Sequence, residues 1–249
     1  MKPYVENFIL DKMKEYNKKI SQGNSGSYKI VKKECNDNII DGYLYKRESD
    51  KKESVIELLN NDNLVMRLGH KEIESTFQII KYARGKVGIV GLGLGYAAQE
   101  MAKKDEVTEV IVYEISSDVI KLYRNNFGEN EKIKIIQGDA FKAEKQSFDY
   151  FYVDIYNYVL SLKVVEDYKF FMKLHDIEEY VFCGVEHFLL SCSYDEIIWV
   201  YIPETWMDMA KAISTALSMS GYIEGYSQLE EKLVSDVLAE FKVVFNEEL

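Results

Sequence analysis

Several features that mark other classes of protein are missing from this sequence. It has no run of about 18 apolar residues, and residues 1–3 begin no signal peptide, so we expect neither a membrane span nor export. Its three cysteines form no CxxC pair, which is typical of reduced thiols in a cytoplasmic protein. Its three histidines form no HxxxH motif. We therefore predict a cytoplasmic protein without a metal site.

Two common enzyme signatures are also missing, the GxxxxGK[ST] phosphate loop and the GxSxG nucleophile elbow. Basic residues are scarce at one end: residues 176–249 hold three Lys or Arg against fifteen Asp or Glu, within a formal net charge of −11. Such a surface repels a phosphate backbone, so nucleic-acid binding is disfavoured. The acidic residues either form a solvated surface or attract a cationic substrate.

The sequence does contain an apolar run that ends in three closely spaced glycines, KVGIVGLGLGY at residues 86–96. Branched apolar residues without a charge are typical of a strand buried on both faces of a parallel sheet. Glycine at 91, 93 and 95 allows φ above zero and leaves the backbone open to a ligand. Helix-forming residues follow. We predict a strand, a glycine turn and a helix that together bind a nucleotide-like or anionic group.

Hydrophobic periodicity predicts the remaining elements. We expect helices at 5–20, 70–83, 118–126, 160–174, 205–219 and 228–245. We expect extended segments at 27–33, 39–46, 54–59, 64–68, 110–113, 133–136, 148–153, 180–182, 188–192 and 197–202. The alternation of strands and helices after the glycine turn indicates crossover connections and a parallel sheet.

These elements predict an α/β fold with a Rossmann-like, mostly parallel sheet and helices on both faces. Residues 1–84 are expected to form a small N-terminal helix and β region. Residues 85–249 are expected to form the Rossmann-like domain, with an acidic helical C-terminal segment covering the mouth of the active site. Three successive predicted strands are followed by a carboxylate, at Glu114, Asp139 and Asp154. Because ligands bind beyond the carboxyl ends of such strands, these groups should converge with the glycine turn.

The glycines fit two frames. The dinucleotide pattern GxGxxA fits only from Gly93, two residues late relative to the strand, which leaves a nicotinamide-dependent oxidoreductase as an alternative. The tighter GxGxG, an acid after the second strand and Gly-Asp-Ala after the third resemble the S-adenosylmethionine-binding domain of class I methyltransferases, over about residues 86–156. The resemblance implies S-adenosylmethionine as cofactor. It places the following residues in the cofactor site: Gly91, Gly93 and Gly95 against the methionine part, Glu114 at the ribose, Asp139 with Ala140 at the adenine, and Ile115 elsewhere against the cofactor.

A narrower resemblance is to spermidine synthases and the methyltransferases built like them. That group has an apolar pair before its glycines, here Ile89 and Val90, and an N-terminal β region. Its GGGDGG run has an aspartate where this chain has Leu94, and the second acid of its DxxDP motif is replaced by Asn157. An amide cannot accept a proton from an amine nucleophile. Methyl transfer is therefore favoured, and aminopropyl transfer remains an alternative.

Methyl transfer requires the protein to hold a nucleophile in line and to exclude water. Asp154 is the candidate catalytic base, although a carboxylate at a strand end can also cap the next helix. Tyr156 and Tyr158 are candidate contacts for a small-molecule acceptor that is aromatic or cationic. A non-catalytic nucleotide-binding protein and a homodimer remain open.

Overall fold

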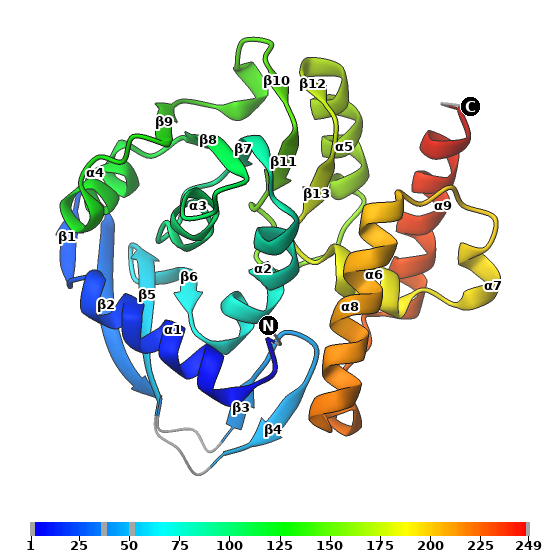
Figure 1. The fold of residues 1–249 in the computed structure, drawn as a ribbon, viewed down its shortest axis with the longest axis horizontal. Coiled ribbons are helices and arrows are strands. Elements are labelled where there is room, and N and C mark those ends of the chain that lie inside the picture. The colour runs from blue at the N-terminus through cyan, green and yellow to red at the C-terminus, as the bar shows by residue number, and fades with distance from the viewer. Residues whose placement is uncertain (1–2, 36–38, 50–52, 248–249) are drawn as a thin grey trace.

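The structure, a computed structural model, describes residues 3–35, 39–49 and 53–247. Its centre is a five-stranded parallel sheet in the order β9-β8-β7-β11-β13 (Figure 1). The strands are β7 Gly85–Val90, β8 Val107–Glu114, β9 Ile133–Gln137, β11 Tyr150–Val153 and β13 Tyr180–Phe182. This order is the Rossmann-like one, so the predicted fold class is confirmed.

Helices flank this sheet, and each follows a strand as the alternating pattern predicts. They are α2 His70–Tyr82, α3 Tyr96–Ala102, α4 Ser117–Phe127, α5 Lys163–Leu174 and α6 Val185–Ser191. A short 3-10 turn, η1 Ala140–Lys142, follows β9, and β10 Ser147–Phe148 pairs in parallel with β12 Asp176–Ile177. The strand predicted at 148–153 is thus divided between β10 and β11.

The N-terminal part is helix α1 Glu6–Lys19 and an antiparallel sheet in the order β1-β2-β5-β6. The strands are β1 Gly23–Ser25, β2 Tyr28–Cys35, β5 Glu53–Asn60 and β6 Asn63–Leu68. The single extended segment predicted at 39–46 is wrong. It is a hairpin of β3 Ile39–Asp41 and β4 Lys46–Glu48, because the chain turns at Gly42, whose N–H donates to the Tyr45 carbonyl over 2.9 Å.

The N-terminal part is packed onto the Rossmann-like sheet. Lys12 Nζ lies 2.7 Å from a Glu100 carboxylate oxygen, and the rings of Tyr16 and Tyr96 meet edge to face at 4.9 Å. One cluster of buried apolar side chains includes Ile9 of α1 as well as residues of β5 and β7. The division that we predict at residue 84 stays a prediction.

The C-terminal segment is helical, as predicted, but two predicted strands in it are wrong. Residues 188–192 lie mainly in α6, which begins after Gly184 in the left-handed conformation, φ +93°. Residue 197 is the last residue of the short helix α7 Tyr194–Ile197, which begins with a capping box of Ser193 and Glu196, and residues 198–202 form no strand. Short apolar runs do not distinguish strand from helix. The remaining elements are α8 Glu204–Ser220, η2 Tyr222–Gly225 and α9 Glu231–Glu247.

Helices α8 and α9 pack beside α5 and α6 at the β13 edge of the sheet, while α4 and β1 lie at the opposite edge (Figure 1). The ring of Phe241 on α9 is fully buried, 5.4 Å from Trp206 on α8 and 6.1 Å from Phe182 on β13. Among the residues that the structure describes, no helix has the length and apolar character needed to cross a bilayer.

Candidate active site

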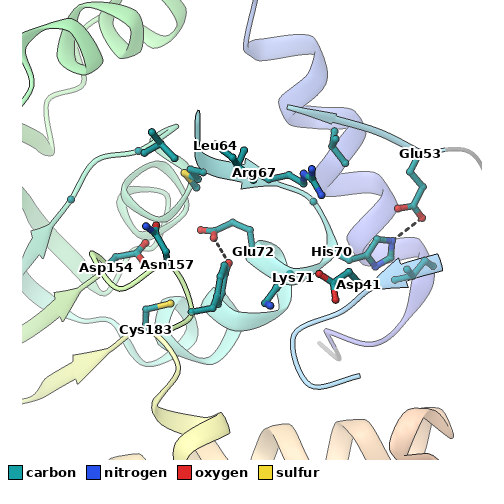
Figure 2. A pocket seen from close by; sticks show the side chains of 18 of the residues that line it. Asp41, Glu53, Leu64, Arg67, His70, Lys71, Glu72, Asp154, Asn157 and Cys183 are labelled. Atoms are coloured by element: carbon teal, nitrogen blue, oxygen red, sulfur yellow. Dashed lines mark hydrogen bonds and ion pairs between the residues drawn. The ribbon is translucent and has the colours of Figure 1, made fainter. Parts of the chain in front are cut away.

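The strand order reverses between β7 and β11, and ligands of open α/β folds bind at such a point, beyond the carboxyl ends of the strands. Gly91 follows β7 there, and Asp154 follows β11. A cavity of about 1280 Å³ lies at this edge. Its walls come from both halves of the chain, including the β3–β4 hairpin, β6, the start of α2 and the glycine turn (Figure 2).

The glycine turn needs its glycines for two different reasons. At Gly91, φ is +99° and a Cβ atom would come 2.7 Å from the backbone carbonyl oxygen of Asp154. Gly93, with φ +51°, faces the cavity, where a Cβ atom would collide with the sulfur of Met66. The Leu94 N–H lies 3.1 Å from that sulfur. The backbone of Gly93 therefore faces β6, and the side chain of Met66 fills the space between them.

Gly95 has a different environment from the other two glycines. It has φ +80° and directly precedes α3 as its N-cap, and a Cβ atom there would collide with the ring of Tyr123 on α4. It is not among the cavity-lining residues. Its smallness is thus explained by helix packing, and its predicted contact with a cofactor stays a prediction.

Glu114 lies at the end of β8 and lines the cavity. The residue is 9% exposed, and its carboxylate accepts the Leu92 N–H at 3.0 Å on one oxygen and the Ser116 N–H at 2.8 Å on the other. A carboxylate can accept about four hydrogen bonds, so acceptor capacity remains for a vicinal diol. Glu114 therefore holds the glycine turn in place and presents free acceptor sites beside it.

The other predicted cofactor residues lie outside the cavity-lining set. Ile115 is 71% exposed. Asp139 accepts the Phe141 N–H at 3.0 Å and lies 3.4 Å from Lys142 Nζ, and Ala140 is buried in η1. Their roles toward adenosine stay predictions.

Asp154 lines the cavity together with two side chains from other elements, Glu72 at the start of α2 and Cys183 after β13 (Figure 2). Glu72 is 4% exposed, and burial together with the charge of Asp154 raises its pKa to about 8. Burial likewise raises the pKa of Asp154 to about 6. Burial disfavours the charged form of a carboxyl, which is why the pKa of each of the two groups lies above its usual value.

The two candidate acceptor tyrosines lie in different places. Tyr158 lines the cavity and its hydroxyl donates to Glu72, with Ser75 Oγ 3.3 Å away. The φ angles of Asn157 and Tyr158 are +47° and +58°, so two successive residues have the left-handed conformation. Tyr156 is buried and donates to Asp167 at 3.0 Å, and it does not line the cavity.

The wall opposite the glycine turn is formed by charged residues of the N-terminal part. His70 Nε2 lies 2.8 Å from Glu53, and although burial lowers the pKa of His70, its contacts with Glu53 and Glu74 raise it to about 9. Arg67 donates to Glu57 at 2.6 Å. Lys71 Nζ lies 4.7 Å from the centre of the Tyr158 ring. The cavity thus has an acidic end at the sheet and a mixed-charge end at the hairpin.

Glu72 is the site residue that the sequence analysis missed. Every residue from Glu72 to Ile79 of α2 is buried, so no single stripe of the helix marks Glu72 out. The sequence carries no local signal for Glu72, because its place at the cavity depends on how α2 packs.

The C-terminal segment does not cover the cavity. The described residues that line it lie between Ile39 and Cys183, and α8 and α9 lie instead at the β13 edge. The expectation of a lid from this segment is therefore wrong. Apolar residues of α8 and α9 pack against α5, α6 and β13, and Ile213 and Leu217 of α8 also pack on the β3–β4 hairpin, which lies beside the cavity.

A scan against protein-family models and a search of curated proteins find no match. Solved structures with a similar fold include spermidine synthase from Thermotoga maritima, at 15% identity and TM-score 0.41, over 79% of this chain and 62% of that one. They include the 23S rRNA methyltransferase ErmE, at 20% identity and TM-score 0.35, over 45% of each chain. They also include DhpI in complex with SAH, at 13% identity and TM-score 0.34, over 41% of this chain and 50% of that one. This chain thus spans about half to three fifths of those proteins, and its own strand order establishes the fold as Rossmann-like.

Proposed function

We propose that this protein is an S-adenosylmethionine-dependent methyltransferase that acts on a small molecule. The observation that carries the proposal is a single cavity at the switch point that is lined by Gly91, Gly93, Glu114 and Asp154 together. Pockets for one small ligand usually measure about 300–1,000 Å³. At about 1280 Å³ this cavity has room for a cofactor and an acceptor side by side.

In this proposal the cofactor lies at the sheet end of the cavity. The backbone of Gly91 and Gly93 faces its methionine part, and the free acceptor sites of Glu114 face its ribose hydroxyls. The sulfonium of the cofactor supplies the methyl group. The protein holds the acceptor against it, and Asp154 takes a proton from the nucleophile.

One observation supports a second candidate function, aminopropyl transfer from decarboxylated S-adenosylmethionine. Asn157 stands where the related motif has its second acid, but Glu72 lines the same cavity as Asp154. The cavity therefore holds two carboxylates despite the amide. The cofactor that binds more tightly distinguishes the two reactions.

Calorimetry with S-adenosylmethionine, its decarboxylated form, S-adenosylhomocysteine and NAD tests the proposal. We expect the first and third to bind most tightly, and a preference for NAD would end the methyltransferase interpretation. Glu114→Ala should weaken S-adenosylhomocysteine by about 1–3 kcal/mol, because it leaves buried donors unmatched. The matched control is Glu109→Ala on the same strand, whose carboxylate pairs with Lys134. Equal affinity of both variants would remove Glu114 from the site.

A further inference from the structure

The segment that joins α6 to α8 exposes several large apolar side chains. Tyr194 is 78% exposed, Trp199 68%, Tyr201 66% and Ile198 47%. All four lie on α7 or in the turn that follows it, within residues 194–201, which we call the aromatic segment. Single exposed apolar residues are common on protein surfaces, whereas several together mark an interaction site. Trp and Tyr are also the residues that contribute most often to binding energy at protein interfaces.

A small apolar pocket adjoins the aromatic segment. It measures about 280 Å³, and Ile197 of the aromatic segment is one of its lining residues. Leu189 and Leu190 of α6 and Met207 and Ala210 of α8 also line it. Pockets for a small ligand are usually larger, at about 300–1,000 Å³. A pocket of this size between helices suits apolar side chains of a bound helix.

The pocket and the aromatic segment are separate from the cavity at the glycine turn. The described residues that line that cavity end at Cys183, and those that line the pocket begin at Leu189. In Figure 1, α7 lies beyond α6, α8 and α9, at the side of the molecule away from α3 and β6. This surface therefore needs an occupant of its own, which is distinct from the cofactor and the acceptor of the proposed function.

The charge of this region indicates the kind of occupant. Residues 193–232 contain seven Asp or Glu and two Lys or Arg. Asp195 and Glu204, which lie on either side of Trp199 in the chain, are exposed and form no ion pair within the described part of the chain. Lys211 lines the pocket, but it lies 4.0 Å from the carboxylate of Asp208.

A net negative surface repels the phosphates of nucleic acids and of anionic lipids, and it repels the same surface of a second copy of the chain. Carboxylates attract Lys and Arg, and so do the faces of exposed Tyr and Trp rings. The occupant must therefore combine large apolar side chains with basic ones. A basic amphipathic helix has both, on opposite sides.

We propose that the aromatic segment and the pocket beside it bind a basic amphipathic helix of another protein. The apolar side of that helix fills the pocket and covers Trp199 and Ile198. Its Lys and Arg side chains lie at the edges of the contact, where they meet Asp195, Glu204 and the ring of Tyr201. The acidic character of the C-terminal part thus serves to attract a cationic partner.

Calorimetry of the full chain with three synthetic peptides of about 18 residues tests the proposal. The first peptide has Leu and Lys at the period of an amphipathic helix. The second has the same composition in an order without that period, and the third has Glu in place of Lys. We expect the first to bind most tightly. Its affinity should fall about tenfold or more when salt is raised from about 50 mM to about 500 mM, because salt screens the charges.

Variants locate the binding site. Trp199→Ala should weaken binding of the first peptide about tenfold or more, because an aromatic anchor is lost. Ser214→Leu, which places a larger side chain in the pocket, should weaken binding similarly while the aromatic segment is kept. Val243→Ala, at a residue of α9 that is 49% exposed and outside the pocket, is the matched control and should change affinity less than about twofold. Trp199 emission should shift to shorter wavelength on binding, whereas Trp206 is already buried.

Unchanged affinity in Trp199→Ala, with its melting temperature preserved, would overturn the proposal, as would equal binding of the Glu-containing peptide. A dimer in sedimentation equilibrium that Trp199→Ala dissociates would overturn it too, because the occupant would then be a second copy of the chain. Tighter binding to phosphatidylcholine vesicles than to the first peptide would make the occupant a membrane. Binding of S-adenosylhomocysteine is measured separately, so failure of this proposal leaves the proposed function untouched.

Discussion

At the scale of single residues, Gly91 illustrates how the sheet switch point constrains the chain. The carbonyl of Asp154 from the neighbouring strand lies where a side chain would begin. The close approach of the chain that follows β11 therefore requires glycine at this position, whether or not a ligand also binds there. Gly221, at the end of α8, has a similar φ of +78° but no atom near its missing Cβ. A substitution at Gly221 therefore tests backbone strain alone, whereas a substitution at Gly91 tests backbone strain together with steric overlap.

Gly91→Ala should destabilise the fold by about 2–6 kcal/mol, because left-handed strain and overlap with the Asp154 carbonyl add together. Gly221→Ala should cost about 1–2 kcal/mol, which is the strain alone. Urea unfolding of both variants measures the difference. Equal costs would show that the carbonyl of Asp154 moves aside freely.

Glu72 makes stability depend on pH. Its folded-state pKa of about 8 lies above the ordinary value of 4.5, so the native protein holds a proton that the unfolded chain has lost between these values. The free energy of unfolding should therefore fall as pH rises from about 4.5 to about 8. Glu186, whose pKa burial raises to about 7, contributes in the same direction.

Glu72→Gln should remove part of this dependence, about 2–4 kcal/mol between pH 5 and pH 8. Urea unfolding of both proteins at several pH values provides the comparison, and the contribution of Glu186 cancels in the difference. Parallel pH profiles for the two proteins would mean that Glu72 ionises normally in the folded state.

At the scale of elements, the sequence predicted the regular helices and the parallel strands, because long amphipathic periods and branched apolar runs survive in any tertiary context. It failed at short segments. Residues 188–192 are apolar enough for a strand, and only the turn at Gly184 sets them into a helix. Likewise, the convergence of Glu72 with Asp154 depends on where α2 packs, and no local pattern encodes that.

The C-terminal helices are expected to stabilise the fold without contributing to ligand binding. Phe241→Ala on α9 should cost about 3–5 kcal/mol, because the ring is buried against Trp206 and Phe182. Val243→Ala on the same helix, at a residue 49% exposed, should change stability by less than about 0.5 kcal/mol. Thermal unfolding measures both. Affinity for S-adenosylhomocysteine below the transition should match the original protein, and a large loss in Phe241→Ala would connect α9 to the cavity.

At the scale of the whole molecule, the N-terminal part and the Rossmann-like part share one buried cluster. The sequence suggested two regions because the strand pattern changes near residue 84. It could not show that α1 lies against α3 through Lys12 and Glu100, since those residues are far apart in the chain. The β3–β4 hairpin belongs to a second buried cluster, in which it packs on α8, and it lies beside the cavity where the sequence led us to expect the C-terminal helices.

Shared packing predicts that the two parts unfold together. Both tryptophans, Trp199 and Trp206, lie in the C-terminal part, so their fluorescence reports on that part alone. Pulsed hydrogen exchange of peptides from β5 reports on the N-terminal sheet. The urea midpoints of the two signals should coincide, and a separate, earlier transition in β5 would show that the N-terminal sheet unfolds on its own.

The methionine that stands before the glycine turn has a consequence for access. Met66 belongs to β6, yet its sulfur fills the volume directly in front of Gly93. Any molecule that lies against that backbone must first swing the thioether aside, and three rotatable bonds make such a swing inexpensive. Oxidation of this sulfur by peroxide gives a larger, polar sulfoxide, which would hinder access of a ligand to the backbone of Gly93.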